Sequence, residues 1–215
     1  MSSDEYIFED RKDAGIQLAD ALLTLGIKAD IVLAIPRGGV PVGMVVADKL
    51  GLPLLLYLVR KIGHPFNDEY AMGAVSEHDW ILNEIEHVDH KYFNKAIKKE
   101  RKRIEEMKEI FGHVATEHEV FGKRIVLVDD GIATGTCILL AMKELRSFNA
   151  KEIIVASPVC PLHTEDKIRQ MADKLITLKH PVHFEGIGAY YANFSQLTDN
   201  QVIELMKRSP IKATQ

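Results

Sequence analysis

The chain has 215 residues, of which 47% are hydrophobic and 27% charged, and its formal net charge is -4. Such values are ordinary for a water-soluble protein with a sizeable core, and they give no general reason to expect nucleic acid or an anionic membrane as a partner. The longest apolar run, residues 50–59, is too short to span a bilayer, and the polar N-terminus matches neither a signal peptide nor a transit peptide. Cys137 and Cys160 are too few for a disulfide framework and lack metal-site spacing, so we expect a reduced, cytoplasmic protein.

Helix-like and strand-like segments alternate along the first half of the chain. Apolar residues at helical spacing predict helices over 10–25 and 40–50, each followed by a glycine. The short apolar runs 31–35 and 54–59 predict buried strands. The segment 62–75 has glycines, a proline and mixed polarity, which predicts a long loop passing into an edge strand.

The second half continues this alternation. A highly charged helix is predicted over 91–112. Beyond it we expect strands at 125–128, 152–159 and 174–178, with helices at about 135–148 and 163–173. Fully apolar strands separated by helices predict an α/β fold, with a mostly parallel central sheet covered on both faces. We expect one domain over 1–215, with a core at about 10–178 and a small C-terminal hood or tail at about 179–215.

Unusual residues follow three of the predicted strands. They are Pro-Arg-Gly-Gly at 36–39, Arg-Lys at 60–61 and the run DDGIATGTC at 129–137. In mostly parallel sheets, ligands bind outside the carboxyl ends of the strands. The three segments are therefore predicted to belong to one ligand site.

The run 129–137 places two adjacent acids before a loop of small residues that leads into a helix. Backbone N–H groups at a helix start suit a phosphomonoester, the hydroxyls of Thr134 and Thr136 add donors, and Gly135 allows close approach. Asp129 and Asp130 cannot bind that phosphate, so we expect them to accept hydrogen bonds from sugar hydroxyls of the same ligand. The alternative is an acidic pocket like that of response regulators, which does not need a threonine–glycine loop directly after the acids.

This stretch resembles the fingerprint of the type I phosphoribosyltransferases, in which apolar residues precede two acids and a phosphate loop containing Thr-Gly. The resemblance implies that Asp129 and Asp130 hold the ribose 2- and 3-hydroxyls of phosphoribosyl pyrophosphate. It also implies that the following loop cradles the 5-phosphate, through Gly131, Ile132, Ala133, Thr134, Gly135, Thr136 and Cys137. Cys137 departs from the family, which commonly has threonine or serine there, because a thiol is a poorer donor than a hydroxyl.

The two earlier strand ends resemble the family's pyrophosphate-binding parts. The pyrophosphate loop is matched by Pro36, Arg37, Gly38 and Gly39, whose glycines expose amides and whose arginine offers a fork of donors. Arg60 and Lys61 resemble the pair that faces pyrophosphate in adenine-type enzymes. On their own these segments could be a glycine turn and a strand cap.

The segments 8–15, 36–43 and 184–202 together are similar to a widespread bacterial group of phosphoribosyltransferases whose acceptor is undefined. The resemblance implies a magnesium-dependent pentosyltransferase (a glycosyltransferase) of nucleotide metabolism, in which a nucleobase-like nitrogen acceptor displaces pyrophosphate from C1 of the ribose. The catalytic residues implied are Asp129, Asp130, Arg37 and Lys61. Mg²⁺ would bind mostly through substrate phosphates and water, with the two aspartates as the protein ligands.

The partners expected are phosphoribosyl pyrophosphate and a small heterocyclic acceptor, with a second copy of the chain as a candidate for a homodimer. One alternative is a non-catalytic regulator that binds phosphoribosyl pyrophosphate or a nucleotide. A second is an enzyme on the same scaffold that passes the ribose phosphate to water. The intact glycine loop at 36–39 and the Arg-Lys pair at 60–61 favour the transferase, because a nucleotide sensor needs no pyrophosphate cradle.

The sequence leaves the acceptor open. Enzymes for 6-oxopurines carry an acid where this chain has Ala133, which argues against a hypoxanthine or guanine enzyme. His64 and Glu69 are candidates for an acid or base, with solvated loop residues as the alternative. The tail could supply aromatic rings that stack on a flat heterocycle. The candidates are Phe184, Tyr190 and Tyr191, and the alternative is that these rings fasten the tail to the core.

The predicted helix at 91–112 carries eight basic residues: Lys91, Lys95, Lys98, Lys99, Arg101, Lys102, Arg103 and Lys108. A basic patch of this kind could bind RNA. Four glutamates are interspersed among them, however, and mixed charges on a long helix are typical of a solvated face with ion pairs. We therefore do not expect nucleic acid as a partner.

Overall fold

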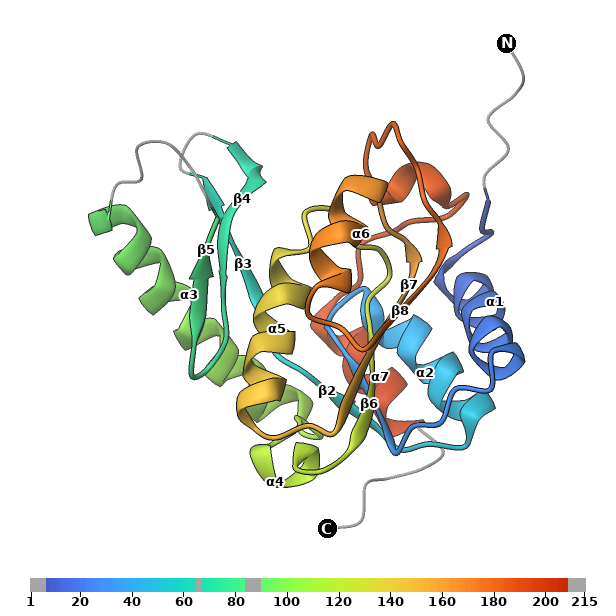
Figure 1. The fold of residues 1–215 in the computed structure, drawn as a ribbon. Helices are drawn as coiled ribbons and strands as arrows, with labels where there is room; N and C mark the ends of the chain where they lie inside the picture. The colour runs from blue at the N-terminus through green and yellow to red at the C-terminus, as the bar shows by residue number, and fades with distance from the viewer. Residues whose placement is uncertain (1–6, 65–66, 84–89, 209–215) are drawn as a thin grey trace.

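A five-stranded parallel sheet lies at the centre of the computed structural model, which describes residues 7–64, 67–83 and 90–208, except the side chains of 67–70 (Figure 1). In spatial order its strands are β2 (Leu54–Leu56), β1 (Ile31–Ala34), β6 (Arg124–Val128), β7 (Glu152–Val159) and β8 (Lys174–Lys179). All four neighbouring pairs run parallel. The predicted α/β fold with a mostly parallel sheet is confirmed.

Alternate residues of the strands face opposite sides of the sheet and build two separate cores. In β6, Val126 and Val128 belong to one core, whereas Ile125 and Leu127 belong to the other. The first core also takes side chains from α1 (Arg11–Thr24), α2 (Gly39–Leu50), α3 (His90–Phe111) and α7 (Asp199–Lys207). The second takes them from α4 (Glu117–Val120), α5 (Thr136–Ser147) and α6 (Leu162–Arg169). This two-sided burial explains why the strands are apolar throughout.

A second, antiparallel sheet stands beside α5 and α3, where the sequence predicted a long loop (Figure 1). It consists of β3 (Arg60–His64), β4 (Asn67–Val75) and β5 (Trp80–Leu82). The predicted loop is wrong for β3 and the start of β4; a strand was expected at the end of the segment, although β4 is the central strand of this sheet and not an edge strand. Antiparallel pairing of the three successive strands satisfies the backbone of this segment of mixed polarity. Gly73 permits the pairing, since a Cβ there would lie 2.2 Å from the Ile81 carbonyl oxygen. The buried strand predicted over 54–59 accordingly ends at Leu56, and Arg60 and Lys61 begin β3.

The segment after β8 folds back onto the N-terminal part of the chain. Tyr191 forms a β-bridge with Phe8, and the 3₁₀ helix η1 (Ile187–Tyr190) lies just before it. Phe8, Ala14, Val159 and Tyr191 form a third, smaller core. Helix α7, which the sequence pattern did not reveal, begins with a capping box between Thr198 and Gln201.

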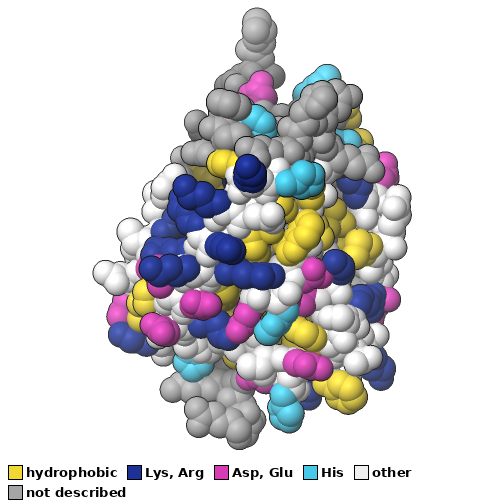
Figure 2. Space-filling model, turned by 90° about the vertical axis from the view of Figure 1, so that its left-hand side faces the viewer, with side chains coloured by type: hydrophobic (Ala, Val, Ile, Leu, Met, Phe, Trp, Pro, Cys, Tyr) yellow, Lys and Arg dark blue, Asp and Glu magenta, His cyan; other side chains and the backbone are white. Residues whose placement is uncertain are grey.

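Helix α3 is amphipathic, with Ile97, Ile104 and Met107 among its buried residues. Figure 2 shows lysine and arginine side chains gathered on one face of the molecule, with acidic side chains beside them. Most ion pairs of α3 reach other elements, as in Lys108 to Glu77 at 2.6 Å and Arg103 to Asp199 at 3.1 Å. In the described ranges, no helix has both the length and the apolar character needed to cross a membrane.

An ion pair at the opening of β6 gives a prediction for stability. Arg124 Nη2 lies 2.7 Å from Asp30 Oδ1, and hydrogen bonding from Arg124 lowers the pKa of Asp30 from 3.8 to about 2. Because the pKa of Asp30 is lower in the folded than in the unfolded chain, its ionised form stabilises the fold at pH values above the unfolded pKa. This stabilisation is lost as the pH falls through the folded pKa of about 2. Both side chains are about a third exposed, so solvent screening should leave Arg124→Ala with only a small loss of stability at pH 7. Urea denaturation should show the difference from wild type narrowing below pH 4, and a constant difference down to pH 3 would contradict the prediction.

Candidate functional site

The pairing of β1 with β6 decides where the site lies. Ala34 pairs with Val128, so the loops that follow the two strands leave the sheet side by side. A Cβ on Gly38 would lie 2.0 Å from Asp130 Oδ2, and one on Gly39 would lie 2.8 Å from the Val128 carbonyl oxygen. Neither distance is tolerable for a real Cβ, so both positions need glycine to let the loop at 36–39 pack against the aspartates.

A cavity of about 220 Å³ lies over this edge of the sheet, at the N-terminal end of α5. Most of the predicted ribose-phosphate residues line it, namely Asp129, Gly131, Ile132, Ala133, Thr134, Gly135, Thr136 and Cys137. Lys61, Ala71 and Ile187 complete its described walls together with Ile138. A larger cavity of about 490 Å³ between α1, α7 and residues 193–197 contains none of the predicted site residues in its lining. The sequence motif therefore coincides with the smaller cavity.

Thr136 is held by a residue that the sequence did not single out. The Nδ2 group of Asn83, just after β5, donates to the Ala71 carbonyl at 2.6 Å and to Thr136 Oγ1 at 3.1 Å. The hydroxyls of Thr134 and Thr136 are 3.0 Å apart. Asn83 thus fastens the antiparallel sheet to the predicted phosphate loop, and no motif marks it because its partner lies 53 positions away.

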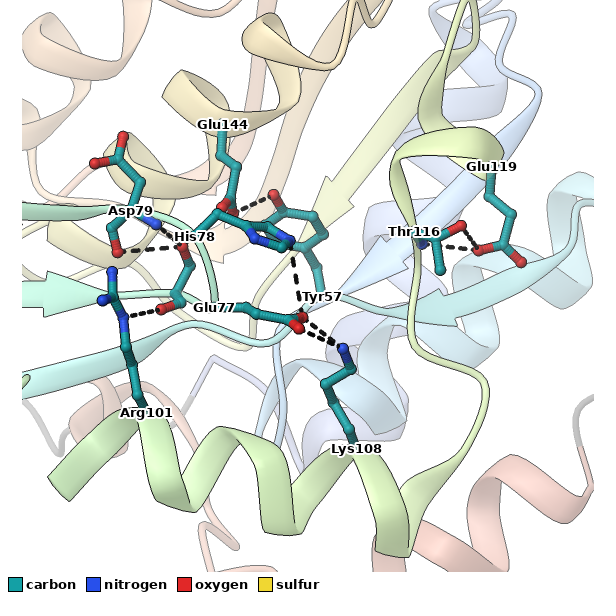
Figure 3. A network of polar contacts seen from close by, with 10 residues as sticks. Tyr57, Glu77, His78, Asp79, Arg101, Lys108, Thr116, Glu119 and Glu144 are labelled. Atoms are coloured by element: carbon teal, nitrogen blue, oxygen red, sulfur yellow. Dashed lines mark hydrogen bonds and ion pairs between the residues drawn. The ribbon is translucent and has the colours of Figure 1, made fainter. Parts of the chain in front are cut away.

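A buried carboxylate fastens the same sheet to α5 (Figure 3). Glu144 accepts hydrogen bonds from the Tyr57 hydroxyl at 2.6 Å and from the Ser76 hydroxyl at 2.8 Å. Burial, and then the charge of Glu144, raises the pKa of Tyr57 far above its usual range. Around this centre, Lys108 of α3 pairs with Glu77 and the Arg101 guanidinium donates to the Ser76 carbonyl at 3.3 Å. These contacts keep β3, and with it Lys61, beside the cavity.

The two adjacent aspartates have different surroundings. Asp130 is 7% exposed, and its Oδ2 lies 2.7 Å from Nε of Arg11, a residue outside the predicted site. Asp129 reaches the cavity, and its Oδ1 accepts the backbone N–H of Asp130 at 2.8 Å. Burial, followed by the charge of Asp130, raises the pKa of Asp129 well above its ordinary value. One acid is thus neutralised by a cation, while the other faces the site.

Of the three cations predicted to bind pyrophosphate, Lys61 is the one that lines the cavity. Arg37 Nη1 is 3.5 Å from Asp199 at the start of α7, and the Pro36–Arg37 peptide bond is cis. Arg60 Nε lies 2.5 Å from Glu100 of α3. The predicted convergence of the three cations is therefore incomplete in this structure, because acids of α3 and α7 fold next to the two arginines.

The tail contributes differently from what was expected. Tyr191 is 2% exposed, packs between Phe8 and Phe194, and donates its hydroxyl to the Asp130 carbonyl at 2.6 Å. Its assignment to the acceptor pocket is therefore corrected: its ring fastens the tail to the core. Phe184 and Tyr190 are half-buried and stacked, with ring centroids 6.2 Å apart, and neither lines the cavity.

Instead, Ile187 lines the cavity and packs on the loop so closely that a Cβ on Gly131 would lie 2.4 Å from its Cγ2. No chemical signal in the sequence marks an isoleucine for such a position. Of the two acid–base candidates, His64 is the last residue of β3, and the Glu69 side chain lies outside the described residues.

Cys137 lies in the cavity wall as the motif predicted. Burial, then the charge of Asp129, raises its pKa to about 12, so the group is a neutral thiol at physiological pH. In the described parts of the chain no group of three or more His, Cys, Asp or Glu residues could hold a metal ion. The site therefore fits a Mg²⁺ ion only if substrate oxygens and water supply most of its ligands, which Mg²⁺ commonly accepts.

The chain is similar to known proteins over most of its length. The family model described as a phosphoribosyl transferase domain matches residues 9–192. A Mycobacterium tuberculosis protein provisionally named a phosphoribosyl transferase is 36% identical over 208 residues, which are 94% of this chain and 47% of that protein. The chain thus spans about half the length of this relative.

Two further similarities extend the comparison. The crystal structure of TT1426 from Thermus thermophilus superposes with a TM-score of 0.75 at 34% identity, covering 94% of this chain and 98% of that one. An amidophosphoribosyltransferase of Rhizobium etli is 28% identical over 155 residues, which are 71% of this chain and 25% of that protein.

The unequal surroundings of the aspartates predict opposite effects of two matched substitutions. A carboxyl group whose pKa is raised by folding favours the folded state at pH values below its pKa in the unfolded chain. As the pH rises through the folded pKa, the group loses this effect. At pH 7 we therefore expect Asp129→Asn to raise the free energy of unfolding by about 1 kcal/mol, or the Tm by about 2–4 °C. Asp130→Asn should lower the stability, because it leaves Arg11 buried without its carboxylate. Thermal unfolding at pH 7 tests both, and a lowered Tm for Asp129→Asn would contradict the assignment.

Proposed function

Because the chain belongs to the phosphoribosyl transferase family, we propose that it transfers the 5-phosphoribosyl group of phosphoribosyl pyrophosphate to a nitrogen of a nucleobase-like acceptor, releasing pyrophosphate. The observation that carries the proposal is the 220 Å³ cavity, which joins an aspartate, a threonine–glycine loop and a lysine at the strand ends. Each of these groups suits a different part of the donor.

The donor's ribose phosphate would lie across the end of β6. The 5-phosphate would meet the backbone N–H groups at the start of α5, where the helix dipole favours an anion, and the hydroxyl of Thr134. Asp129 would accept hydrogen bonds from ribose hydroxyls, as would the remaining oxygen of Asp130. The packing of Gly38 on Asp130 would hold the pyrophosphate loop next to the sugar.

The leaving pyrophosphate gains negative charge as its bond to C1 breaks, so cations fixed beside it lower the barrier. Lys61 already lines the cavity. The side chain of Arg37 is 45% exposed and 3.5 Å from Asp199, a pairing weak enough for pyrophosphate to compete with. Asp129 is the carboxylate best placed to contribute to Mg²⁺ binding, and the ion would supply further charge neutralisation to the substrate phosphates.

The chemistry of the cavity walls limits the kind of acceptor that we expect. Beside Asp129, Lys61 and Cys137, the described lining is apolar or hydroxyl-bearing, and the loop has alanine at 133. The Cys137 thiol, with a pKa of about 12, is no base at neutral pH. We therefore infer an acceptor whose nitrogen attacks with little help from a protein base.

A non-catalytic regulator that binds the same ligand is the second candidate, and one observation favours it. Arg37 and Arg60 are paired with Asp199 and Glu100, so two parts of the pyrophosphate cradle are directed elsewhere in this structure. A ligand that lacks pyrophosphate would not need them.

Binding and turnover together test the proposal. Calorimetry with phosphoribosyl pyrophosphate and Mg²⁺ should show binding to the wild type and loss of at least about tenfold in affinity for Asp129→Asn. Asp20→Asn is the control and should bind normally, because it alters an exposed acid on α1 that pairs with Lys49 of α2. Pyrophosphate release would then be measured against a panel of nucleobases. Absence of donor binding would overturn the proposal, and binding without turnover of any base would support the regulator.

The contact between the glycine loop and Asp130 gives a second test. Gly38→Ala would place a methyl group 2.0 Å from Asp130 Oδ2, so the acid or the loop must move. We expect donor affinity to fall by at least about tenfold, with the fold retained. Gly43→Ala is a matched control in α2, the helix that follows Gly38, since its Cβ would press on the Cβ of Ala34 in β1 at 2.9 Å. It should lower the Tm and leave donor affinity nearly unchanged; equal losses of affinity in both variants would refute a specific role for Gly38.

A further inference from the structure

Arg11 is the least expected residue near the site, and three contacts fix its guanidinium. Nε donates to Asp130 Oδ2 at 2.7 Å, Nη1 donates to the Ser195 carbonyl at 2.8 Å, and the guanidinium carbon lies 3.9 Å above the Phe194 ring. The Arg11 and Asp130 side chains are each 11% exposed. Two hydrogen bonds and the stacking on Phe194 therefore fix the orientation of the planar Arg11 guanidinium.

These contacts join three parts of the chain that are far apart in sequence. Arg11 is the first residue of α1, Asp130 follows β6, and Phe194 and Ser195 belong to the tail. The tail holds the same aspartate a second time, because the Tyr191 hydroxyl donates to the Asp130 carbonyl. Asp130 is thus held at its side chain by Arg11 and at its backbone by the tail.

The arrangement answers the electrostatic difficulty of two adjacent carboxylates. Like charges at such close range disfavour each other, and a cation in direct contact with one of them offsets that repulsion. Arg11 binds Oδ2 of Asp130, and the backbone of Gly38 packs closely on the same carboxylate, since a Cβ there would lie 2.0 Å from Oδ2 and 2.7 Å from Oδ1. Asp129 lines the cavity, and Oδ1 of Asp130 is the oxygen that Arg11 does not bind.

We propose that Arg11 is a positioning residue of the ribose site, which fixes the Asp130 carboxylate for the sugar hydroxyls and couples the tail at 191–195 to that site. The inference rests on the proposed function, since it needs a ribose-containing ligand. It differs from a purely structural ion pair in one respect. A positioning role affects ligands that contain ribose and spares those that do not.

Three ligands separate the two roles: phosphoribosyl pyrophosphate, ribose 5-phosphate and inorganic pyrophosphate, each titrated calorimetrically with Mg²⁺. For Arg11→Ala we expect the affinity for the two ribose ligands to fall at least about tenfold, the loss typical of a charge-assisted hydrogen bond. The affinity for pyrophosphate should change less than about twofold. Arg11→Lys should recover part of the loss, because it restores the charge without the fork.

Arg124→Ala is the matched control, because it removes an arginine–aspartate pair at the opposite end of β6. It should leave the affinity for all three ligands unchanged. Phe194→Leu is the second variant, since it removes the ring beneath Arg11 and keeps both charges. It should give a smaller loss of affinity, confined to the ribose ligands. If Arg11→Ala does not fold, Phe194→Leu and Arg11→Lys together test whether Arg11 is a positioning residue.

The outcomes of the two hypotheses are distinct. If the wild type binds none of the three ligands, the proposed function itself fails. If the wild type binds phosphoribosyl pyrophosphate and the folded Arg11 and Phe194 variants bind it equally well, the inference is overturned and the proposed function stands. Equal losses for pyrophosphate and for the ribose ligands would likewise overturn it, because they would indicate general damage to the fold.

Discussion

The parallel pairing of β1 with β6 is the constraint on which the rest of the site depends. Because Ala34 and Val128 are in register, the glycine loop after β1 and the acidic loop after β6 emerge at the same level and touch. The touching surfaces are the backbone of Gly38 and Gly39 and the Asp129–Asp130 pair, with no room for a Cβ between them. The parts that would bind pyrophosphate and ribose are therefore in direct contact at Gly38 and Asp130.

Burying two neighbouring carboxylates at this junction is unfavourable, and the two acids differ in how their charges are compensated. Arg11 and the tail stabilise Asp130, whereas Asp129 stands at the cavity with a raised pKa. A carboxyl group with a strongly raised pKa at a cavity is typical of functional sites. The unfavourable burial of its charge can be offset when a ligand binds. The N-terminal helix and the C-terminal segment thus both contact Asp130 directly, even though their backbones lie outside the main sheet.

The antiparallel sheet completes the site from the opposite side. Lys61 and Ala71 bring β3 and β4 to the cavity, and Asn83 fixes the hydroxyl of Thr136. The buried Glu144 network holds this sheet on α5, whose first two residues, Thr136 and Cys137, end the predicted phosphate loop. Because α5 carries both the end of this loop and Glu144, one helix links the antiparallel sheet to the loop.

The parallel sheet, most of the helices and the position of the candidate site at the strand ends could be predicted from the sequence. Those features follow from local patterns: apolar runs, helical spacing, and the acids and glycines at 36–39 and 129–137. Two features of the site could be seen only in the folded chain: Arg11 neutralises Asp130, and Tyr191 is a core residue. Each of these depends on partners far away in the chain, such as the 119 positions between Arg11 and Asp130. A local pattern carries the chemistry of a residue, but which charge or ring lies beside it is decided by packing of the whole chain.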